Sequence, residues 1–285
     1  MEPTITTLTA FGQARLTRHP AGTVHSVYRK TVNLCLGGQL LALQAAGSPL
    51  SPISLLTDLE EAALAALPLA MGDPVRLVGD ILQVGGCRFS LRGAAVRSLA
   101  LSPARPEDLT ELAARLQQAL AQRRPGGLEP LLLSDAPFAE EPLFLTAARR
   151  RLEGLGRALL ASDWSGAAAG LGGLVGLGPG LTPSGDDFLC GMLAGLLLAG
   201  LWQHPFATCL MRQIASRLPD TNAISAAFLQ CALEGQYSEA VVQLSTLPPV
   251  EEILTAFSAI GHSSGSDTLC GVLYLLERRG ALLAG

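Results

Sequence analysis

The sequence has few charges, and they show no strong excess of one sign. Only 15% of its 285 residues are charged and the net charge is −4, whereas 49% are hydrophobic. A disordered chain needs the opposite balance, so we expect a compact, largely helical protein of one large or two smaller domains. Basic residues do not gather beyond short pieces such as Arg149–Arg151. This argues against nucleic acid or an anionic membrane as the main partner.

The chain also lacks several local signatures. Its six cysteines show no C-x-x-C pair and no paired Cys/His spacing of a structural zinc site, so we expect them to be reduced and mostly buried. The first thirty residues have no secretory signal, which makes the cytoplasm the expected location. The most apolar segment, Phe188 to Trp202, has fifteen residues, and a membrane-spanning helix needs about twenty. A buried core helix is therefore expected there.

Residues 23–101 have the pattern of β-strands. Apolar and polar residues alternate on either side of Gly37-Gly38, and again around Gly85-Gly86, as in β-hairpins. A short helix from about Asp58 to Leu67 is expected between them, with Asp58 as its N-cap. These patterns predict a small, mostly antiparallel β-domain.

After Ser102-Pro103 the apolar period lengthens from two residues to nearly four. Leu109, Leu112, Leu116 and Leu120 form one helical stripe that stops at the Pro and Gly residues of 124–127. Further helices are expected at about 140–161, 186–202, 205–217, 222–234, 249–260 and 267–279. The predicted fold class is α+β, with a β-rich domain over residues 1–104 followed by an all-helical domain over residues 105–285.

A ten-residue element occurs twice in the helical half. Residues 184–193 read SGDDFLCGML and residues 264–273 read SGSDTLCGVL, with seven identities in the same register. Each copy fits a helix start, in which the serine caps the helix and the aspartate three residues later completes a capping box. Gly191 and Gly271 would lie inside these helices, where glycine costs about 1 kcal/mol relative to alanine. We infer that this cost is offset by a close contact between the two helices, which places their N-termini side by side.

Two adjacent helix N-termini favour an anion or a developing oxyanion. The stretch GLGPGLTPSGDD before the first helix suits a ligand loop, because glycines at 176, 178 and 180 permit positive φ and close backbone approach. It matches neither a Walker A loop nor a dinucleotide-binding fingerprint. The candidate substrate-binding residues are Gly178, Gly180, Thr182, Ser184, Gly185, Asn222, Ser263, Ser264 and Gly265.

The candidate catalytic residues are His262, Asp187 and Asp267. His262 lies in GHSSGSD and either faces the shared site as an acid or base or caps the helix ending near Ile260. Asp187 and Asp267 either act as helix caps or, with Asp186, hold a divalent cation such as Mg²⁺, so no cofactor is certain. Asn222 has a second interpretation as a plain helix cap.

The two elements resemble a known family. They are similar to the paired signature of the AllH-like family, which includes AllH, a subunit of bacterial oxamate carbamoyltransferase. The matching stretches are GPGLTPSGDDFLCG and GHSSGSDTLCG. The resemblance implies phosphorolysis of oxalurate to oxamate and carbamoyl phosphate in purine and allantoin catabolism, with other carbamoyltransferase subunits as partners. It also implies small anionic substrates, namely a phosphate or a carboxylate. The alternatives are a non-catalytic subunit that binds a carboxylate or nucleotide, or serves as a scaffold, and a metal-dependent hydrolase that uses the three aspartates.

Overall fold

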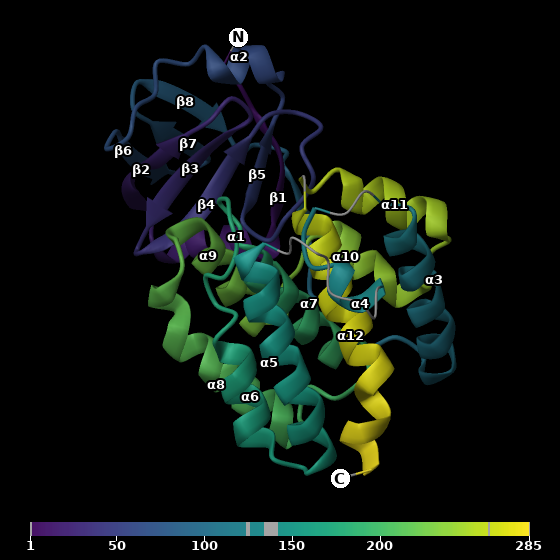
Figure 1. Ribbon diagram of the computed structural model, residues 1–285. Helices are drawn as coiled ribbons and strands as arrows, with labels where there is room; N and C mark the ends of the chain where they lie inside the picture. The colour runs from purple at the N-terminus through teal and green to yellow at the C-terminus, as the bar shows by residue number, and fades with distance from the viewer. Residues whose placement is uncertain (1, 124–125, 134–141, 262, 285) are drawn as a thin grey trace. The chain divides into compact units, whose positions relative to one another are not determined.

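The computed structural model describes residues 2–123, 126–133, 142–261 and 263–284. The chain divides into two compact units, residues 1–100 and residues 101–285 (Figure 1). The first unit is built on a β-sheet and the second is helical, so the α+β class expected from the sequence is confirmed.

Over its described residues, the first unit forms one nine-stranded sheet in the order β8-β7-β6-β2-β3-β4-β5-β1-β9. The pairs β4/β5 and β1/β9 are parallel, and the other neighbouring pairs are antiparallel. The strands are β1 (Ile5–Thr9), β2 (Ala21–Val27), β3 (Thr31–Leu36), β4 (Gln39–Gln44), β5 (Ser54–Thr57), β6 (Pro74–Val78), β7 (Ile81–Val84), β8 (Cys87–Ser90) and β9 (Ala95–Arg97).

Both predicted hairpins form. Residues Gly37 and Gly38 join β3 to β4 with φ of 57° and 78°, in the left-handed region that glycine adopts without strain. Gly85 and Gly86 likewise join β7 to β8. An isolated bridge between Thr4 and Ser90 connects the edge strand β8 to the residue just before β1, which lies next to the opposite edge of the sheet. The sheet is therefore curled.

The predicted N-cap at Asp58 is wrong. Helix α2 (Glu61–Ala65) starts after Glu60, which makes no side-chain cap, and Asp58 instead accepts hydrogen bonds from the backbone and hydroxyl groups of Thr4. Asp58 therefore fixes the start of β1. The sequence patterns also gave no sign of α1 (Ala10–Arg18), whose first turn is capped by the Thr9 hydroxyl.

The second unit consists of helices with short connections. They are α3 (Leu109–Ala121), α4 (Pro130–Leu133), α5 (Leu143–Leu160), α6 (Trp164–Gly172), α7 (Ser184–Leu198), α8 (Pro205–Arg217), α9 (Ala223–Leu233), α10 (Glu239–Gln243), α11 (Val250–Ser258) and α12 (Ser264–Ala284). The expected helix at 205–217 agrees with α8 at both ends, and most others agree within a few residues. Three short helices, α4, α6 and α10, were not predicted.

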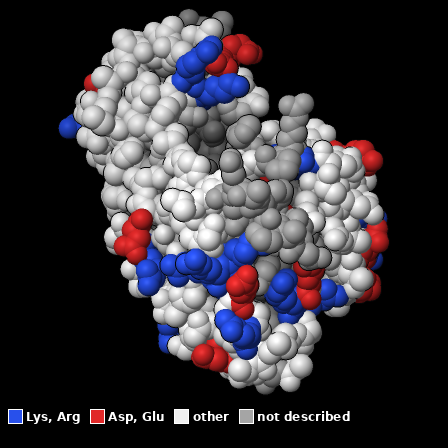
Figure 2. All heavy atoms as spheres, in the orientation of Figure 1, with Lys and Arg blue, Asp and Glu red and all other residues white. Residues whose placement is uncertain are grey.

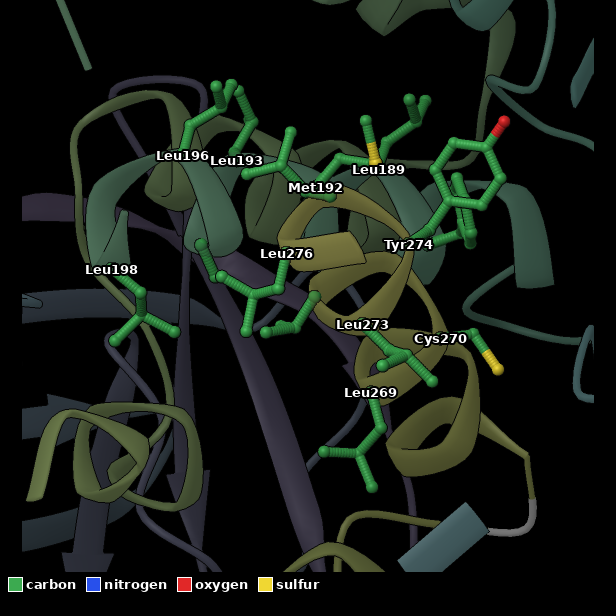
Figure 3. Close-up of a cluster of buried hydrophobic side chains, with 14 of the residues drawn as sticks. Leu189, Met192, Leu193, Leu196, Leu198, Leu269, Cys270, Leu273, Tyr274 and Leu276 are labelled. Atoms are coloured by element: carbon green, nitrogen blue, oxygen red, sulfur yellow. The ribbon is translucent and has the colours of Figure 1, made fainter. Parts of the chain in front are cut away.

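Helices α7 and α12 pack side by side at the centre of this unit (Figure 1). Most of their leucines, together with Met192, Cys270 and Tyr274, belong to the main hydrophobic core (Figure 3). Every labelled side chain in that view is at most 4% exposed. The expectation that the apolar run after Asp187 is a buried core helix is therefore confirmed.

No described helix has both the length and the apolar character that crossing a membrane requires. On the face drawn in Figure 2, Arg side chains gather over the helical unit with Asp and Glu side chains between them. Ion pairs such as Arg115–Glu111 and Arg217–Asp220 belong to this unit. The charges on this face are therefore mixed in sign.

Candidate functional site

The contact between α7 and α12 is made by two glycines. A β-carbon on Gly191 would collide with the Thr268 carbonyl, and one on Gly271 would collide with the Phe188 carbonyl. Each would also stand only 2.9 Å from the α-carbon of the other glycine. The inferred close approach of the two helices is thus confirmed, and it explains why glycine is present at both positions despite its cost in a helix.

This approach places the first turns of the two helices together. We call residues Ser184–Asp187 of α7 and Ser264–Asp267 of α12 the paired first turns. Asp187 has the Ser264 hydroxyl as a hydrogen-bonding neighbour, and Asp267 has the Ser184 hydroxyl in the same role. The serine of each copy therefore interacts with the aspartate of the other copy.

This crosswise exchange corrects the predicted capping box. The helices begin at Ser184 and Ser264, close to where the motif placed them, but the N-cap of α7 is Pro183, with no side-chain hydrogen bond. Sequence alone could not reveal the exchange, because Ser-x-x-Asp has the same spacing whether it closes on itself or on a second copy.

The aspartates of the paired first turns are buried, with 7% of Asp187 and 0% of Asp267 exposed. Burial raises the pKa of Asp187 well above its usual value; Ser264 and Thr182 lower this pKa, and the nearby Asp267 raises it further. Burial also raises the pKa of Asp267 to about 7, although hydrogen bonds from Leu128 and Ser184 oppose the shift. Asp267 is therefore partly protonated at neutral pH, and burial favours the neutral form of Asp187 as well. A neutral carboxyl does not repel an anion, so protonation of these two groups reduces the conflict between acidic side chains and an anionic ligand.

Each of these carboxyl groups has one oxygen left over. Among the described residues, Oδ2 of Asp187 and Oδ2 of Asp267 are buried without a partner of full hydrogen-bond geometry. An unsatisfied buried polar atom costs about 1–3 kcal/mol. Both atoms belong to the paired first turns, where hydrogen-bond donors of a ligand would satisfy them.

The glycine-rich loop folds onto the start of α7. Gly176, Gly178 and Gly180 all have positive φ, as predicted from the sequence. The Gly185 amide donates to the Leu177 carbonyl at 2.8 Å, so this amide is not free for a ligand.

Asp186 has a different role from its neighbour Asp187. Its carboxylate accepts hydrogen bonds from the Gly176 amide at 2.8 Å, the Thr221 hydroxyl at 2.5 Å and the Ser225 hydroxyl at 2.7 Å. These contacts tie the glycine-rich loop and α9 to α7. We call this the clamp role of Asp186: its carboxylate holds the loop and α9 against α7. Within the described ranges, no group of three acidic, His or Cys side chains is arranged to hold a metal ion.

The remaining predicted site residues lie around the paired first turns or apart from them. Thr182 and Ser263 are half-buried beside Asp187 and Asp267 respectively, and each lowers the pKa of its neighbour by hydrogen bonding. Gly265 packs against the Phe257 carbonyl. Asn222 caps α9 by accepting from the Ile224 and Ser225 amides, as its second interpretation required.

The loop glycines are nearer to solvent. Gly178 is half-buried against Ser184, and Gly180 is exposed. His262, the predicted acid or base, lies outside the described residues, so its role stays a prediction.

Sequence reasoning missed one segment of the site. The Leu128 amide donates to Oδ1 of Asp267 at 2.6 Å, and a β-carbon on Gly127 would collide with the same carboxylate. The only local signal was the Gly126-Gly127 pair, which the sequence explained as a helix stop. No pattern linked it to a motif some 140 residues later.

The cysteines of the two motifs do not have the properties of nucleophiles. Burial raises the pKa of both Cys190 and Cys270 well above the usual thiol value, and nearby carboxylates raise it further. All six cysteines lie in the described ranges and form no disulfide; Cys231 and Cys270 are buried, and the other four are half-buried. The expectation of mostly buried thiols therefore holds only in part.

Together these observations define a class of protein: a β-sheet unit and a helical unit whose duplicated helix starts form a shared polar site. Residues 174–276 match the family model described as oxamate carbamoyltransferase subunit AllH, and residues 5–97 match the model of the AllH family N-terminal domain. The two models together cover more than half of the chain, and the protein belongs to the AllH family. No solved structure matches the chain.

Proposed function

We propose that this chain, as a subunit of a cytoplasmic oxamate carbamoyltransferase, takes part in converting oxalurate and phosphate to oxamate and carbamoyl phosphate in purine and allantoin catabolism. We further propose that the reacting groups bind at the paired first turns. The observation that carries the proposal is the crosswise pairing of Ser184 and Ser264 with Asp267 and Asp187, which leaves two buried carboxyl oxygens without partners.

The chemistry of this reaction suits the site. A phosphate oxygen attacks the ureido carbonyl carbon, the bond from that carbon to the oxamate nitrogen breaks, and the leaving nitrogen takes up a proton. A group that donates this proton works best when its pKa is near the working pH. Asp267, with a pKa of about 7, meets that requirement, and His262 is the second candidate. The dipoles of α7 and α12 favour the negative charge that develops on the carbonyl oxygen.

The test is turnover of the enzyme assembled from this chain and its partner subunits. We expect Asp267→Asn to lower kcat for carbamoyl phosphate formation by about 10²–10⁴-fold, the usual contribution of a positioned acid or base. Asp80→Asn, in an exposed turn of the first unit, is the matched control and should leave kcat unchanged. His262→Ala is expected to abolish turnover with the fold intact.

The alternative role gives a different result. A chain that only binds a ligand or holds the assembly together should tolerate both Asp267→Asn and His262→Ala with full kcat. That outcome would move the chemistry to a partner subunit and refute the catalytic part of the proposal.

A further inference from the structure

A third buried acid reaches the same site from a segment outside both motifs. Glu129 precedes α4, and only 2% of its surface is exposed. Its Oε2 accepts the Gly127 amide at 2.8 Å and the Gly126 amide at 3.4 Å. These two backbone donors fix the position of the carboxylate and explain how it is held away from water.

Glu129 lies close to Asp267 and acts on it electrostatically. The adjacent residue Leu128 donates its amide to Oδ1 of Asp267 at 2.6 Å. Glu129 is also among the groups that raise the pKa of Asp267, after burial as the main cause. The segment 126–129 thus brings a second carboxylate next to Asp267.

One oxygen of Glu129 is also without a partner. Among the described residues, buried side-chain oxygens without a partner include Oε1 of Glu129, Oδ2 of Asp187 and Oδ2 of Asp267. The first belongs to a segment far from the other two in sequence. A ligand with several N–H donors would satisfy such a group of acceptors, whereas a ligand made only of acceptor oxygens would leave them unsatisfied.

We propose that Glu129 is a substrate-binding residue that determines specificity, accepting a hydrogen bond from an N–H of a ureido group bound at the paired first turns. The inference rests on the proposed function, because it takes oxalurate as the ligand. The ureido part of oxalurate carries three N–H bonds, as many donors as there are unpaired oxygens on Glu129, Asp187 and Asp267. Glu129 then favours a ureido anion over a plain dicarboxylate of similar size.

The experiment compares two ligands on the full chain by titration calorimetry. Oxalurate carries N–H donors, and oxalate has none. Glu129→Gln keeps the size of the side chain but removes its charge and replaces one acceptor oxygen with an amide group. We expect the Kd for oxalurate to rise about 10- to 100-fold, as for loss of a hydrogen bond to a charged group, while the Kd for oxalate stays the same or falls. Glu153→Gln, on the exposed face of α5, is the matched control and should change neither Kd.

The outcomes separate this inference from the proposed function. If Glu129→Gln binds oxalurate as tightly as the unaltered chain does, the inference is wrong and the proposed function stands. An equal loss of affinity for both ligands would mean that Glu129 is only structural, which also overturns the inference. If the unaltered chain does not bind oxalurate at all, the proposed substrate site itself is wrong.

A second measurement keeps the test valid if Glu129→Gln fails to fold. Hydrogen exchange of the unaltered chain should slow at the amides of residues 126–129 when oxalurate is added, because the ligand holds Glu129 and its two backbone donors in place. Oxalate should have no such effect. Equal exchange rates with and without oxalurate would refute the role of this segment.

Discussion

Gly191 of α7 and Gly271 of α12 lie back to back, so close that a β-carbon on either would stand 2.9 Å from the other α-carbon. Alanine favours helix by about 1 kcal/mol over glycine, but here its methyl group would strike backbone atoms that cannot rotate away. Overpacking of this kind costs about 1–3 kcal/mol. This steric cost exceeds the gain in helix propensity, so the net effect of the substitution on stability is unfavourable. We expect Gly191→Ala and Gly271→Ala each to lower the free energy of unfolding in urea denaturation.

Gly280 is the control for this prediction, because it lies on the same helix α12, is exposed and has nothing near its β-position. Gly280→Ala should leave the protein as stable or more stable by up to about 1 kcal/mol. If Gly191→Ala behaved like Gly280→Ala, the two helices would have to be farther apart than described.

The raised carboxyl pKa values predict a stability that falls as the pH rises. The folded pKa of Asp267 is about 7, whereas an unfolded Asp has a pKa near its usual value of about 3.9. The folded state therefore binds more protons between these values, and the free energy of unfolding decreases from pH 4 to pH 7 by an amount on the order of 4 kcal/mol from this group. Asp187 acts in the same direction because its pKa is also raised.

Urea denaturation at pH 5, 6, 7 and 8 measures this dependence. Asp267→Asn should flatten the curve and be more stable than the unaltered chain at pH 8, because it removes a buried group that ionises there. The exposed Asp80→Asn should leave the slope as it is. A slope that Asp267→Asn does not change would show that this carboxyl has an ordinary pKa in the folded protein.

The clamp role of Asp186 predicts a large cost of removal. Asp186→Ala leaves the Gly176 amide and the hydroxyls of Thr221 and Ser225 without their acceptor. We expect a loss of about 3 kcal/mol in the free energy of unfolding, more than the roughly 1 kcal/mol expected for Asp163→Ala, which removes only the N-cap of α6. Equal losses from the two substitutions would contradict the clamp.

Ligand binding should stabilise the chain against heat. A ligand that binds only the folded state at 100 times its Kd adds about 2.7 kcal/mol. We expect oxamate, phosphate or carbamoyl phosphate to raise the Tm by several degrees, and Mg²⁺ alone to have no effect. A rise in Tm with Mg²⁺ alone would instead support the metal-dependent interpretation of the aspartates.

The parts of the fold that could be predicted depend on local patterns. Gly37-Gly38 and Gly85-Gly86 identify hairpins because positive φ is a local demand, and the prolines at 205, 219, 248 and 249 mark breaks between helices. The strand order could not be predicted in the same way, because pairs such as β2/β6 and β1/β9 join segments far apart in the sequence. Helix α6 was missed because its run of Gly and Ala has no apolar period.

The site could be predicted only where it repeats. The identity of the two copies indicated that Gly191 meets Gly271, since two glycines at equivalent helix positions need one common explanation. The contribution of Gly127, Leu128 and Glu129 occurs once and has no counterpart in the sequence, so only the three-dimensional contacts reveal it. Asp186 and Asp187 are adjacent and chemically identical, and only their different neighbours separate a clamp from a candidate catalytic acid.

The pairing of α7 with α12 also constrains how this protein is made. A ribosome synthesises α7 first, and every helix from α8 to α11 follows before α12 emerges. Until then the flat glycine face of α7 and the Asp187 carboxyl lack their partners on α12, so the helical unit cannot complete its native core as the chain grows. A nascent chain stalled before α12 should therefore be a ready substrate for chaperones and proteases.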